Sequence, residues 1–325
     1  MAVIGIECSA HTFGAGIVED GKVLSNERRM YKISDKGMIP SRLADFHSEG
    51  AGTAISNAIS GAGISANEIE AVGYTKGPGL GASLRIGFLS AYALSRKLGV
   101  PLIPVNHGIA HIEIAKRLNH MKDPVALYVS GGNSQILKLA DKPYLHYNVY
   151  GETYDIGVGN MLDSFARGAG LNPAWGSSVA KMSSGGKYID LPYTVKGMDF
   201  TFTGLMTHAL AKLRSAPLRD VCYSIQETAF SMLCEASERA LLLTGSKEMV
   251  VCGGVGQSDR LKEMIRAMAR PHRVKVGTVA DEYNADNGAM IGVVAERIFL
   301  SGHKRERGPE IDQRYRLDSV KVTWS

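Results

Sequence analysis

A pattern of three short strands separated by two turns occurs twice along the chain, about 120 residues apart, and each copy precedes helical segments. The strands expected in the first copy are Ala2–Glu7, Thr12–Val18 and Val23–Tyr31, with Asp20-Gly21 as a hairpin turn, and those in the second are Pro124–Val129, Ser134–Leu139 and Tyr144–Tyr150. A repeated unit of this kind predicts two related α/β lobes, each with a mixed sheet, antiparallel hairpins and crossover helices.

The rest of the chain fits this plan. Apolar residues at helical spacing predict helices over Leu43–Ser60, Ser83–Leu98, Arg219–Leu243, Asp259–Met268 and Ala285–Phe299. Further strands are expected at Ile69–Tyr74, Pro101–Val105, Glu248–Cys252 and Arg273–Gly277, and a β-like segment at Ser319–Trp324 in the charged tail from Lys304. We therefore expect an N-terminal lobe at residues 1–117 plus about 300–325, and a C-terminal lobe at 118–299 with a helical insertion at about 151–245.

Composition narrows the class of protein. The 325 residues include 45% hydrophobic and 21% charged residues, which is typical of a globular enzyme rather than a disordered chain. The net charge of +5 is compatible with a nucleic-acid partner but does not require one. Cys8, Cys222, Cys234 and Cys252 are widely spaced, which favours free thiols in a reducing compartment. Without a signal-peptide pattern or a membrane-length apolar run, we expect a soluble cytoplasmic protein.

Two histidines carry the sharpest chemical signal. His107 and His111 are four residues apart, so on a helix both imidazoles lie on one face and can reach a single ion. Gly108 follows the first histidine, so the glutamate of the His-Glu-x-x-His peptidase pattern is missing, which argues against peptide hydrolysis. The alternative is a pair of exposed helical histidines with no ligand.

An acidic stretch, Asp281 to Gly288, directly precedes the last predicted helix. Its Asp286 could supply a carboxylate ligand, and a mixture of imidazole and carboxylate suits iron, zinc or manganese. The alternative is that Asp286 only caps the helix.

Three turns of small residues could approach a nucleotide. They are Glu7 to Thr12, Ser130 to Ser134 and Gly253 to Ser258. The first two occupy equivalent places in the two copies of the repeat, and the third joins a strand to a helix N-terminus, where backbone amides attract anions. Because the Gly-x-Gly-x-x-Gly and Walker A patterns are absent, Rossmann and P-loop folds are disfavoured.

Other segments are open to two interpretations. The glycine-rich Lys76 to Gly81 is either an ordinary loop or a backbone contact, and Phe202 to Leu205 is either a substrate loop or a turn before a helix. A basic run is either a solvated face or an RNA contact; it comprises Arg260, Lys262, Arg266, Arg270, Arg273 and Lys275.

Taken together, these motifs resemble one family, the tRNA threonylcarbamoyladenosine-forming enzymes of the archaeal and eukaryotic type, formerly labelled O-sialoglycoprotein endopeptidases. The resemblance runs from Ile4 to Trp324. It is carried by Gly5-Ile6-Glu7, His11 to Gly14, Gly77 to Gly81, Asn106-His107 with His111, Tyr128 to Asn133, Gly159-Asn160, Leu162-Asp163, Gln226 to Thr228, Gly253 to Val255, Asp286 to Gly288, Gln313 to Arg316 and Val322 to Trp324.

The resemblance implies an actin-like, ribonuclease-H-like α/β fold of two duplicated lobes with mixed sheets and an interlobe nucleotide cleft. It also implies transfer of a threonylcarbamoyl group from threonylcarbamoyl-AMP to the tRNA adenosine 3′ of the anticodon. The implied cofactors are one divalent metal per subunit, Fe²⁺ or else Zn²⁺, and an adenylate or ATP-type nucleotide with or without Mg²⁺.

Carried over residue by residue, the resemblance implies metal ligands at His107, His111, Tyr128 and Asp286. The implied adenylate contacts are Tyr128, Val129, Ser130, Gly131, Gly132, Asp163, Gly176 and Ser258, with Ser9, His11 and Thr12 on the phosphate side. The chain departs from the family's usual pattern at four places. It has Pro173 to Ser177 where the family has Pro-Gly-Gly-Pro, and Ala180-Lys181 where the family has an acidic residue. It also has Ser258 in place of asparagine and Phe46-His47 in place of paired histidines.

The implied partners are tRNA, a small serine/threonine kinase and the other subunits of the KEOPS assembly. The kinase is fused behind this domain in some species, and the sequence fits either a stand-alone chain or an excised domain. Three alternatives compete with the transferase: a small-molecule kinase of the same superfamily, a metallopeptidase, and a non-catalytic scaffold for the kinase partner.

Overall fold

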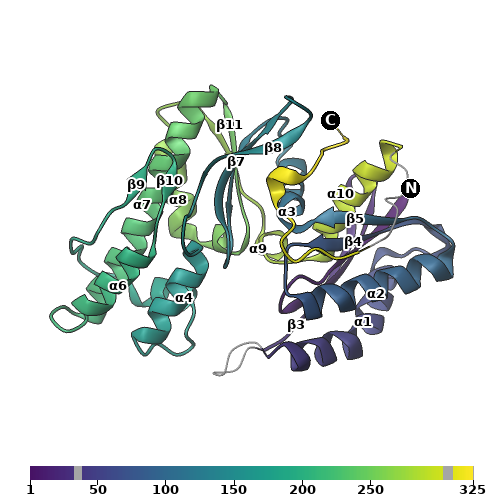
Figure 1. The fold of residues 1–325 in the computed structure, drawn as a ribbon, viewed down its shortest axis with the longest axis horizontal. Coiled ribbons are helices and arrows are strands. Elements are labelled where there is room, and N and C mark those ends of the chain that lie inside the picture. Colours follow the sequence, from purple (N-terminus) through teal and green to yellow (C-terminus); the bar gives the residue numbers. More distant parts are fainter. Residues whose placement is uncertain (33–38, 303–309, 325) are drawn as a thin grey trace. The chain divides into compact units, whose positions relative to one another are not determined.

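The computed structural model describes residues 1–32, 39–302 and 310–324. The chain divides into two compact units (Figure 1). The first unit comprises Met1–Leu118, Ala140–Tyr147 and Ala285–Ser325, and the second comprises Asn119–Leu139 and Asn148–Asn284. None of the helices in the described ranges is long and apolar enough to cross a bilayer.

The first unit is built on a five-stranded mixed sheet of order β3-β2-β1-β4-β5. Its strands are β1 (Ala2–Glu7), β2 (Thr12–Glu19), β3 (Lys22–Met30), β4 (Ile69–Gly77) and β5 (Leu102–Asn106). The β2–β3 hairpin turns at Asp20 and Gly21, whose φ values of 50° and 71° match the left-handed pair of a tight hairpin turn. The first predicted strand and this turn are confirmed.

Helices cover both faces of this sheet, with α1 and α2 on one face and α3 and α10 on the other (Figure 1). Their bounds are α1 (Pro40–Ala62), α2 (Gly81–Leu98), α3 (His107–Leu118) and α10 (Gly288–Leu300), with short 3₁₀ turns η1 (Ala66–Glu68) and η3 (Leu317–Ser319). The helix predicted at Leu43 begins earlier because Pro40, whose φ is already helical, occupies the first turn, and it ends at Gly63, which is left-handed with φ 68°.

Glycines let α10 approach the sheet at backbone distance. A Cβ on Gly5 of β1 would lie 2.1 Å from the backbone nitrogen of Gly292, and one on Gly16 of β2 would lie 2.4 Å from that of Ala289. No side chain fits in that space, so the sequence requires glycine there. This close packing determines where the residues just before α10 emerge.

The second unit has a sheet of the same topology, of order β12-β11-β6-β7-β8. Its strands are β6 (Val125–Val129), β7 (Ser134–Ala140), β8 (His146–Glu152), β11 (Glu248–Cys252) and β12 (Lys275–Gly277). The other elements are α4 (Val158–Gly168), α5 (Gly176–Met182), the β9 (Val195–Lys196) and β10 (Asp199–Phe200) hairpin, α6 (Thr203–Lys212), α7 (Leu218–Thr244), η2 (Gly254–Gln257), α8 (Asp259–Ala269) and α9 (Asp281–Asn284). In both sheets a three-stranded antiparallel hairpin set is followed by two parallel strands, so the predicted duplicated α/β plan is confirmed.

The prediction of a β-like tail is wrong. After η3 the segment to Trp324 joins no sheet. Its alternating pattern is nevertheless real, because Val320, Val322 and Trp324 are buried at 9%, 3% and 7% exposure. Every second side chain of this segment is buried, but its one strand-like backbone hydrogen bond among the described residues runs from the Val322 N–H to the Leu145 carbonyl, at 2.8 Å. The charged part of the tail from Lys304 to residue 309, and Ser325, lie outside the described residues.

Candidate metal centre

The histidine pair lies on the first turns of α3. The helix starts there because the Asn106 Oδ1 accepts the amide hydrogens of Gly108 at 3.0 Å and Ile109 at 3.1 Å, satisfying two otherwise unpaired donors. His107 and His111 are buried at 8% and 1% exposure, and their ring centroids lie 4.8 Å apart. The alternative of two exposed histidines is therefore wrong.

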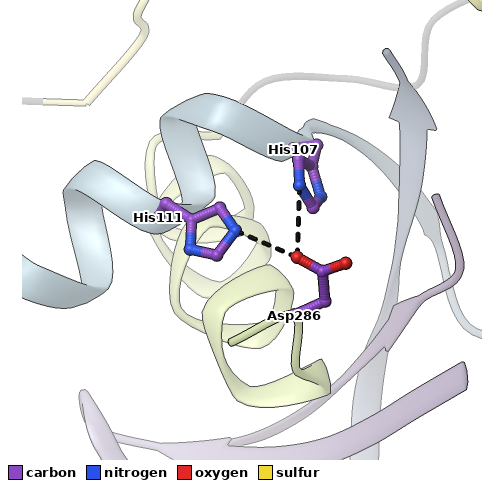
Figure 2. Close-up of side chains that lie close together, drawn as sticks. All are labelled: His107, His111 and Asp286. Carbon is purple, nitrogen blue, oxygen red and sulfur yellow. Dashed lines mark hydrogen bonds and ion pairs between the residues drawn. The ribbon is translucent and has the colours of Figure 1, made fainter. Parts of the chain in front are cut away.

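Asp286 lies in the short connection between α9 and α10. The side chain that caps α10 belongs to its neighbour, since the Asn287 Oδ1 accepts the amide hydrogen of Met290 at 2.9 Å. The alternative that Asp286 only caps the helix is therefore wrong. Figure 2 shows the Asp286 carboxylate facing both imidazoles, with its Oδ1 at 3.3 Å from His111 Nε2 and 3.5 Å from His107 Nε2.

These separations fit a shared ion. Ligand atoms held about 2.1 Å from one tetrahedral metal lie roughly 3.4 Å from each other. The nitrogen and oxygen atoms of this group all lie within 4.8 Å of one another. Two imidazoles and a carboxylate are donors suited to divalent iron or zinc. The chain therefore contains a His-His-Asp group that could hold a metal ion, and all three residues belong to the first unit.

The electrostatics of the group favour a cation. Burial lowers the pKa of His107, but the carboxylates of Glu7 and Asp286 outweigh it and raise that pKa to about 9. Burial lowers the pKa of His111, so its imidazole is neutral at neutral pH and has a lone pair to donate. Burial alone would raise the pKa of Asp286, yet the two histidines hold it well below its usual range, so Asp286 is ionised.

The structure places Glu7 beside the histidine pair, a role that the sequence motifs containing Glu7 did not predict. Glu7, the last residue of β1, is fully buried, and its Oε2 lies 3.1 Å from His107 Nδ1. A carboxylate behind a metal-binding histidine is a common second partner in metal sites. A signal was present, because an acidic residue at the end of an otherwise apolar strand has to find a buried partner.

The turn after β1 has fewer available amides than expected. The Ser9 amide hydrogen is donated to Glu7 Oε1 at 2.8 Å, so it is not available to a phosphate. The His11 carbonyl accepts the amide hydrogen of Tyr31 at 2.8 Å, and Thr12 is buried at the start of β2. Glu7 therefore joins this turn to the histidine pair within the first unit.

The equivalent turn of the second unit follows Tyr128 and Val129 of β6. The Ser130 amide donates to the Asn133 carbonyl at 2.8 Å, which closes the turn. The carbonyls of Ser130 and Gly131 accept the amide hydrogens of Gly159 at 3.3 Å and Asn160 at 3.0 Å in the first turn of α4. The turn with Gly131 and Gly132 is thus fixed against that helix.

Two other expected contact residues of the second unit meet each other. The Asp163 Oδ1 accepts the Gly176 amide hydrogen at 2.6 Å, and burial raises the pKa of Asp163. Ser258 instead caps α8, its Oγ accepting the amide hydrogen of Leu261 at 3.4 Å.

The two less decisive motifs of the second unit have structural roles. Phe202 to Leu205 forms the start of α6, where the Asp155 carboxylate accepts the amide hydrogens of Phe202 and Thr203. In the basic run, Arg260 makes a bidentate pair with Glu227, and Lys262 contacts Asp259. These pairings favour the solvated-face interpretation of the run.

The two sheets of one topology place this chain among the actin-like α/β proteins, and it contains a candidate metal centre as well. The structure is similar to that of HypF from T. kodakarensis, with a TM-score of 0.62 and 16% identity over 93% of this chain and 48% of that one. At that identity the similarity shows the fold alone.

Sequence comparison is more specific. The family model for tRNA N6-adenosine threonylcarbamoyltransferase matches residues 22–293. A tRNA N6-adenosine threonylcarbamoyltransferase of Sulfurisphaera tokodaii is 45% identical over all of this chain and 98% of its own length. A probable bifunctional tRNA threonylcarbamoyladenosine biosynthesis protein of Thermoplasma volcanium is 42% identical over all of this chain and 62% of its own length. The chain belongs to the tRNA N6-adenosine threonylcarbamoyltransferase family and is an acyltransferase.

Proposed function

We propose that the enzyme transfers the threonylcarbamoyl group of threonylcarbamoyl-AMP to N6 of the tRNA adenosine 3′ of the anticodon, and that it depends on a metal held by His107, His111 and Asp286. The observation that carries the metal dependence is the convergence of both Nε2 atoms on one carboxylate oxygen, at 3.3 and 3.5 Å. Family membership supports the tRNA substrate and the group transferred.

The reaction needs no protein nucleophile. The N6 amine of adenosine attacks the carbamoyl carbon, the bond from that carbon to the phosphate oxygen breaks, AMP leaves with the bonding electrons, and N6 loses one proton. The chain must therefore bind the adenylate, orient its carbonyl toward the tRNA and exclude water, which would hydrolyse the activated carbamate. A divalent ion would supply Lewis-acid stabilisation of the charge that develops on oxygen.

We propose Fe²⁺ as the metal, with Zn²⁺ as the alternative, and Tyr128 of the second unit as a fourth ligand. Imidazole and carboxylate donors support either ion. For the adenylate we propose contacts from Tyr128 to Gly132 and from Asp163, Gly176 and Ser258, with Ser9, His11 and Thr12 on the phosphate side. The hydrogen-bonded Ser130–Asn133 turn supports the first set. The Ser258 hydroxyl already accepts the Leu261 amide hydrogen, so its contact with the adenylate would be an additional one.

The two enzymatic alternatives have weaker support. A small-molecule kinase of this fold needs soluble magnesium and has no use for a buried imidazole pair. A peptidase needs a general base beside the metal. Glu113 is the acidic residue nearest in sequence to the histidine pair. Its carboxylate is instead bound within the first unit by Lys116, at 3.0 Å, and by Arg297 and Tyr147, and it points into that buried cluster.

We also propose a small serine/threonine kinase and the other KEOPS subunits as partners, and a cytoplasmic location alongside the tRNA substrate. Bifunctional relatives that this chain covers over only 62% of their length support a second activity working with this one. A scaffold without catalysis would bind such a kinase but would not need an intact histidine pair.

Reconstitution tests the proposal. Unmodified tRNA is incubated with the threonylcarbamoyl-adenylate synthase, ATP, threonine, bicarbonate, the partner proteins and this chain, either metal-stripped or reloaded with Fe²⁺ or Zn²⁺. We expect the modified nucleoside by mass spectrometry only with the reloaded chain, and none with His107→Ala, although that variant still binds the kinase. Equal product with the stripped chain would refute metal dependence, and no product under any metal condition would refute the transferase assignment.

A further inference from the structure

Glu7 is a charged side chain in a fully buried strand. All six residues of β1 are buried, and Glu7 has 0% exposure. Burying a carboxylate is costly unless hydrogen-bond donors surround it, so a residue of this kind needs specific partners.

Three donors surround the Glu7 carboxylate. Its Oε1 accepts the Ser9 amide hydrogen at 2.8 Å, and its Oε2 accepts the Thr75 hydroxyl hydrogen at 2.6 Å. The third neighbour is His107 Nδ1, at 3.1 Å from Oε2. A carboxylate only accepts hydrogen bonds, so the His107 nitrogen facing it must carry a hydrogen.

The hydrogen on Nδ1 determines what the opposite nitrogen can do. In a neutral imidazole with its hydrogen on Nδ1, Nε2 carries the lone pair. The Nε2 of His107 is the atom that faces Asp286 Oδ1, at 3.5 Å. When an ion displaces the second ring hydrogen of His107, the hydrogen bond to Glu7 keeps the remaining hydrogen on Nδ1, and the Nε2 lone pair then faces the place where the ion would lie.

We propose that Glu7 is a positioning residue, which fixes the tautomer and ring orientation of His107 for metal binding and ties that ring to the turn at Ser9. The inference rests on the proposed metal site. It assigns to Glu7 no contact with substrate, and it makes the buried carboxylate part of the site rather than of the fold alone.

The substitution Glu7→Gln separates hydrogen bonding from packing, because glutamine has nearly the same shape. The Ser9 amide is a fixed donor, so the glutamine oxygen has to face it. The glutamine NH₂ then faces Thr75 and His107, and His107 Nδ1 must become the acceptor. His107 would carry its hydrogen on Nε2, where it blocks coordination.

Metal affinity is the first measurement. Zn²⁺ binding is measured by chelator competition at one pH for the wild-type chain, Glu7→Gln and the control Thr75→Val, which removes a donor to Glu7 but keeps the acceptor for His107. We expect Glu7→Gln to weaken binding about 10- to 100-fold and Thr75→Val to weaken it by less than about threefold. Equal affinities for the wild type and Glu7→Gln would overturn the inference. A wild-type chain that binds no Zn²⁺ would instead refute the proposed metal site itself.

Histidine NMR of the Zn²⁺-loaded wild type provides a second test, which needs no variant to fold. Two-bond proton–nitrogen correlations in chain labelled with ¹⁵N-histidine distinguish the two ring nitrogens. We expect His107 to coordinate through Nε2 and to carry a slowly exchanging hydrogen on Nδ1. Coordination through Nδ1, with the hydrogen on Nε2, would overturn the assignment to Glu7 while leaving the metal site intact.

Discussion

Asp286 and Asn287 are neighbours with different roles. Asn287 caps α10, and because that cap is occupied the Asp286 carboxylate can turn toward the histidines. Either residue type is a good helix cap, so the sequence alone left the assignment open. The half-buried Asp286 carboxylate faces two imidazoles, and this geometry makes the group a candidate metal site rather than a helix terminus.

The ligand assignment predicts a selective loss of metal. His111→Ala removes one of three donors, and Asp286→Asn removes the charge that offsets the cation, so each variant should retain well under one ion per chain. The exposed His208 on α6 provides the control, since His208→Ala should bind like the wild type. Metal content after gel filtration, measured by plasma mass spectrometry, checks this. Full occupancy in His111→Ala would remove that residue from the ligand set.

The lowered carboxyl pKa of Asp155 leads us to expect that this residue makes a pH-dependent contribution to the stability of the second unit. Burial raises its pKa, but the amide hydrogens of Phe202, Thr203 and Ile156 outweigh this and lower the pKa from 3.8 to about 2. A depressed carboxyl pKa stabilises the fold above the unfolded value, and this contribution is lost as the pH falls from about 4 to 2. Asp155 is exposed to solvent, so we expect no more than about 1 kcal/mol. Denaturant titrations of the wild type and Asp155→Asn should draw together as the pH falls from about 4 to 2, and a gap that is constant from pH 6 to 2 would contradict this.

For single residues, the sequence predicts contacts between residues that are close along the chain better than contacts between distant ones. The i, i+4 spacing of His107 and His111 follows from helix geometry alone. Two of the three partners of Glu7, Thr75 and His107, are 68 and 100 residues away, and only the parallel pairing of β1 with β4 and the position of α3 bring them together. No local pattern contains that information.

Among the elements, α10 determines the geometry of the centre. The glycines of β1 and β2 let it lie on the sheet at backbone distance, and Asp286 precedes its first turn. The sequence did not predict this close packing, because which backbone the glycines of β1 and β2 face depends on tertiary structure. The burial pattern of the tail was visible from sequence, whereas the lack of a partner strand was not.

Close packing of α10 predicts the effect of one methyl group. Gly5→Ala would place a Cβ 2.1 Å from the Gly292 nitrogen, so the helix must move and the chain should lose about 3 kcal/mol. Gly52→Ala on α1, where nothing lies within 4 Å, should instead gain about 0.5–1 kcal/mol. Unfolding free energies from denaturant titration check the pair. A loss below 0.5 kcal/mol for Gly5→Ala would contradict the packing described.

Over the whole molecule, the two sheets repeat one topology, and the duplicated strand pattern was enough to predict it. The sequence shows less clearly how the proposed metal and adenylate contacts are divided between the two units. All three residues of the His-His-Asp group belong to the first unit, and the proposed adenylate contacts from Tyr128 to Ser258 belong to the second. The first unit has both histidines on the helix that follows β5, whereas the segment after β12, the equivalent strand of the second unit, contains no histidine.

This division predicts where metal binding protects the backbone. Adding Zn²⁺ to stripped chain should slow amide hydrogen exchange in α3 and at the start of α10. If Tyr128 is the fourth ligand, protection should extend to the end of β6, whereas α6 should not change. Mass spectrometry of peptic fragments resolves these segments. Protection confined to the first unit would remove Tyr128 from the ligand set.

The metal site that we propose consists of His107, His111 and Asp286 around one ion. Anomalous X-ray diffraction at the metal absorption edge, from crystals of metal-loaded chain, tests it most directly. We expect one strong peak within bonding distance of both Nε2 atoms and the Asp286 carboxylate, at about 2.1 Å from each. A loaded crystal with no peak at these three side chains, or with its peak elsewhere, would contradict it.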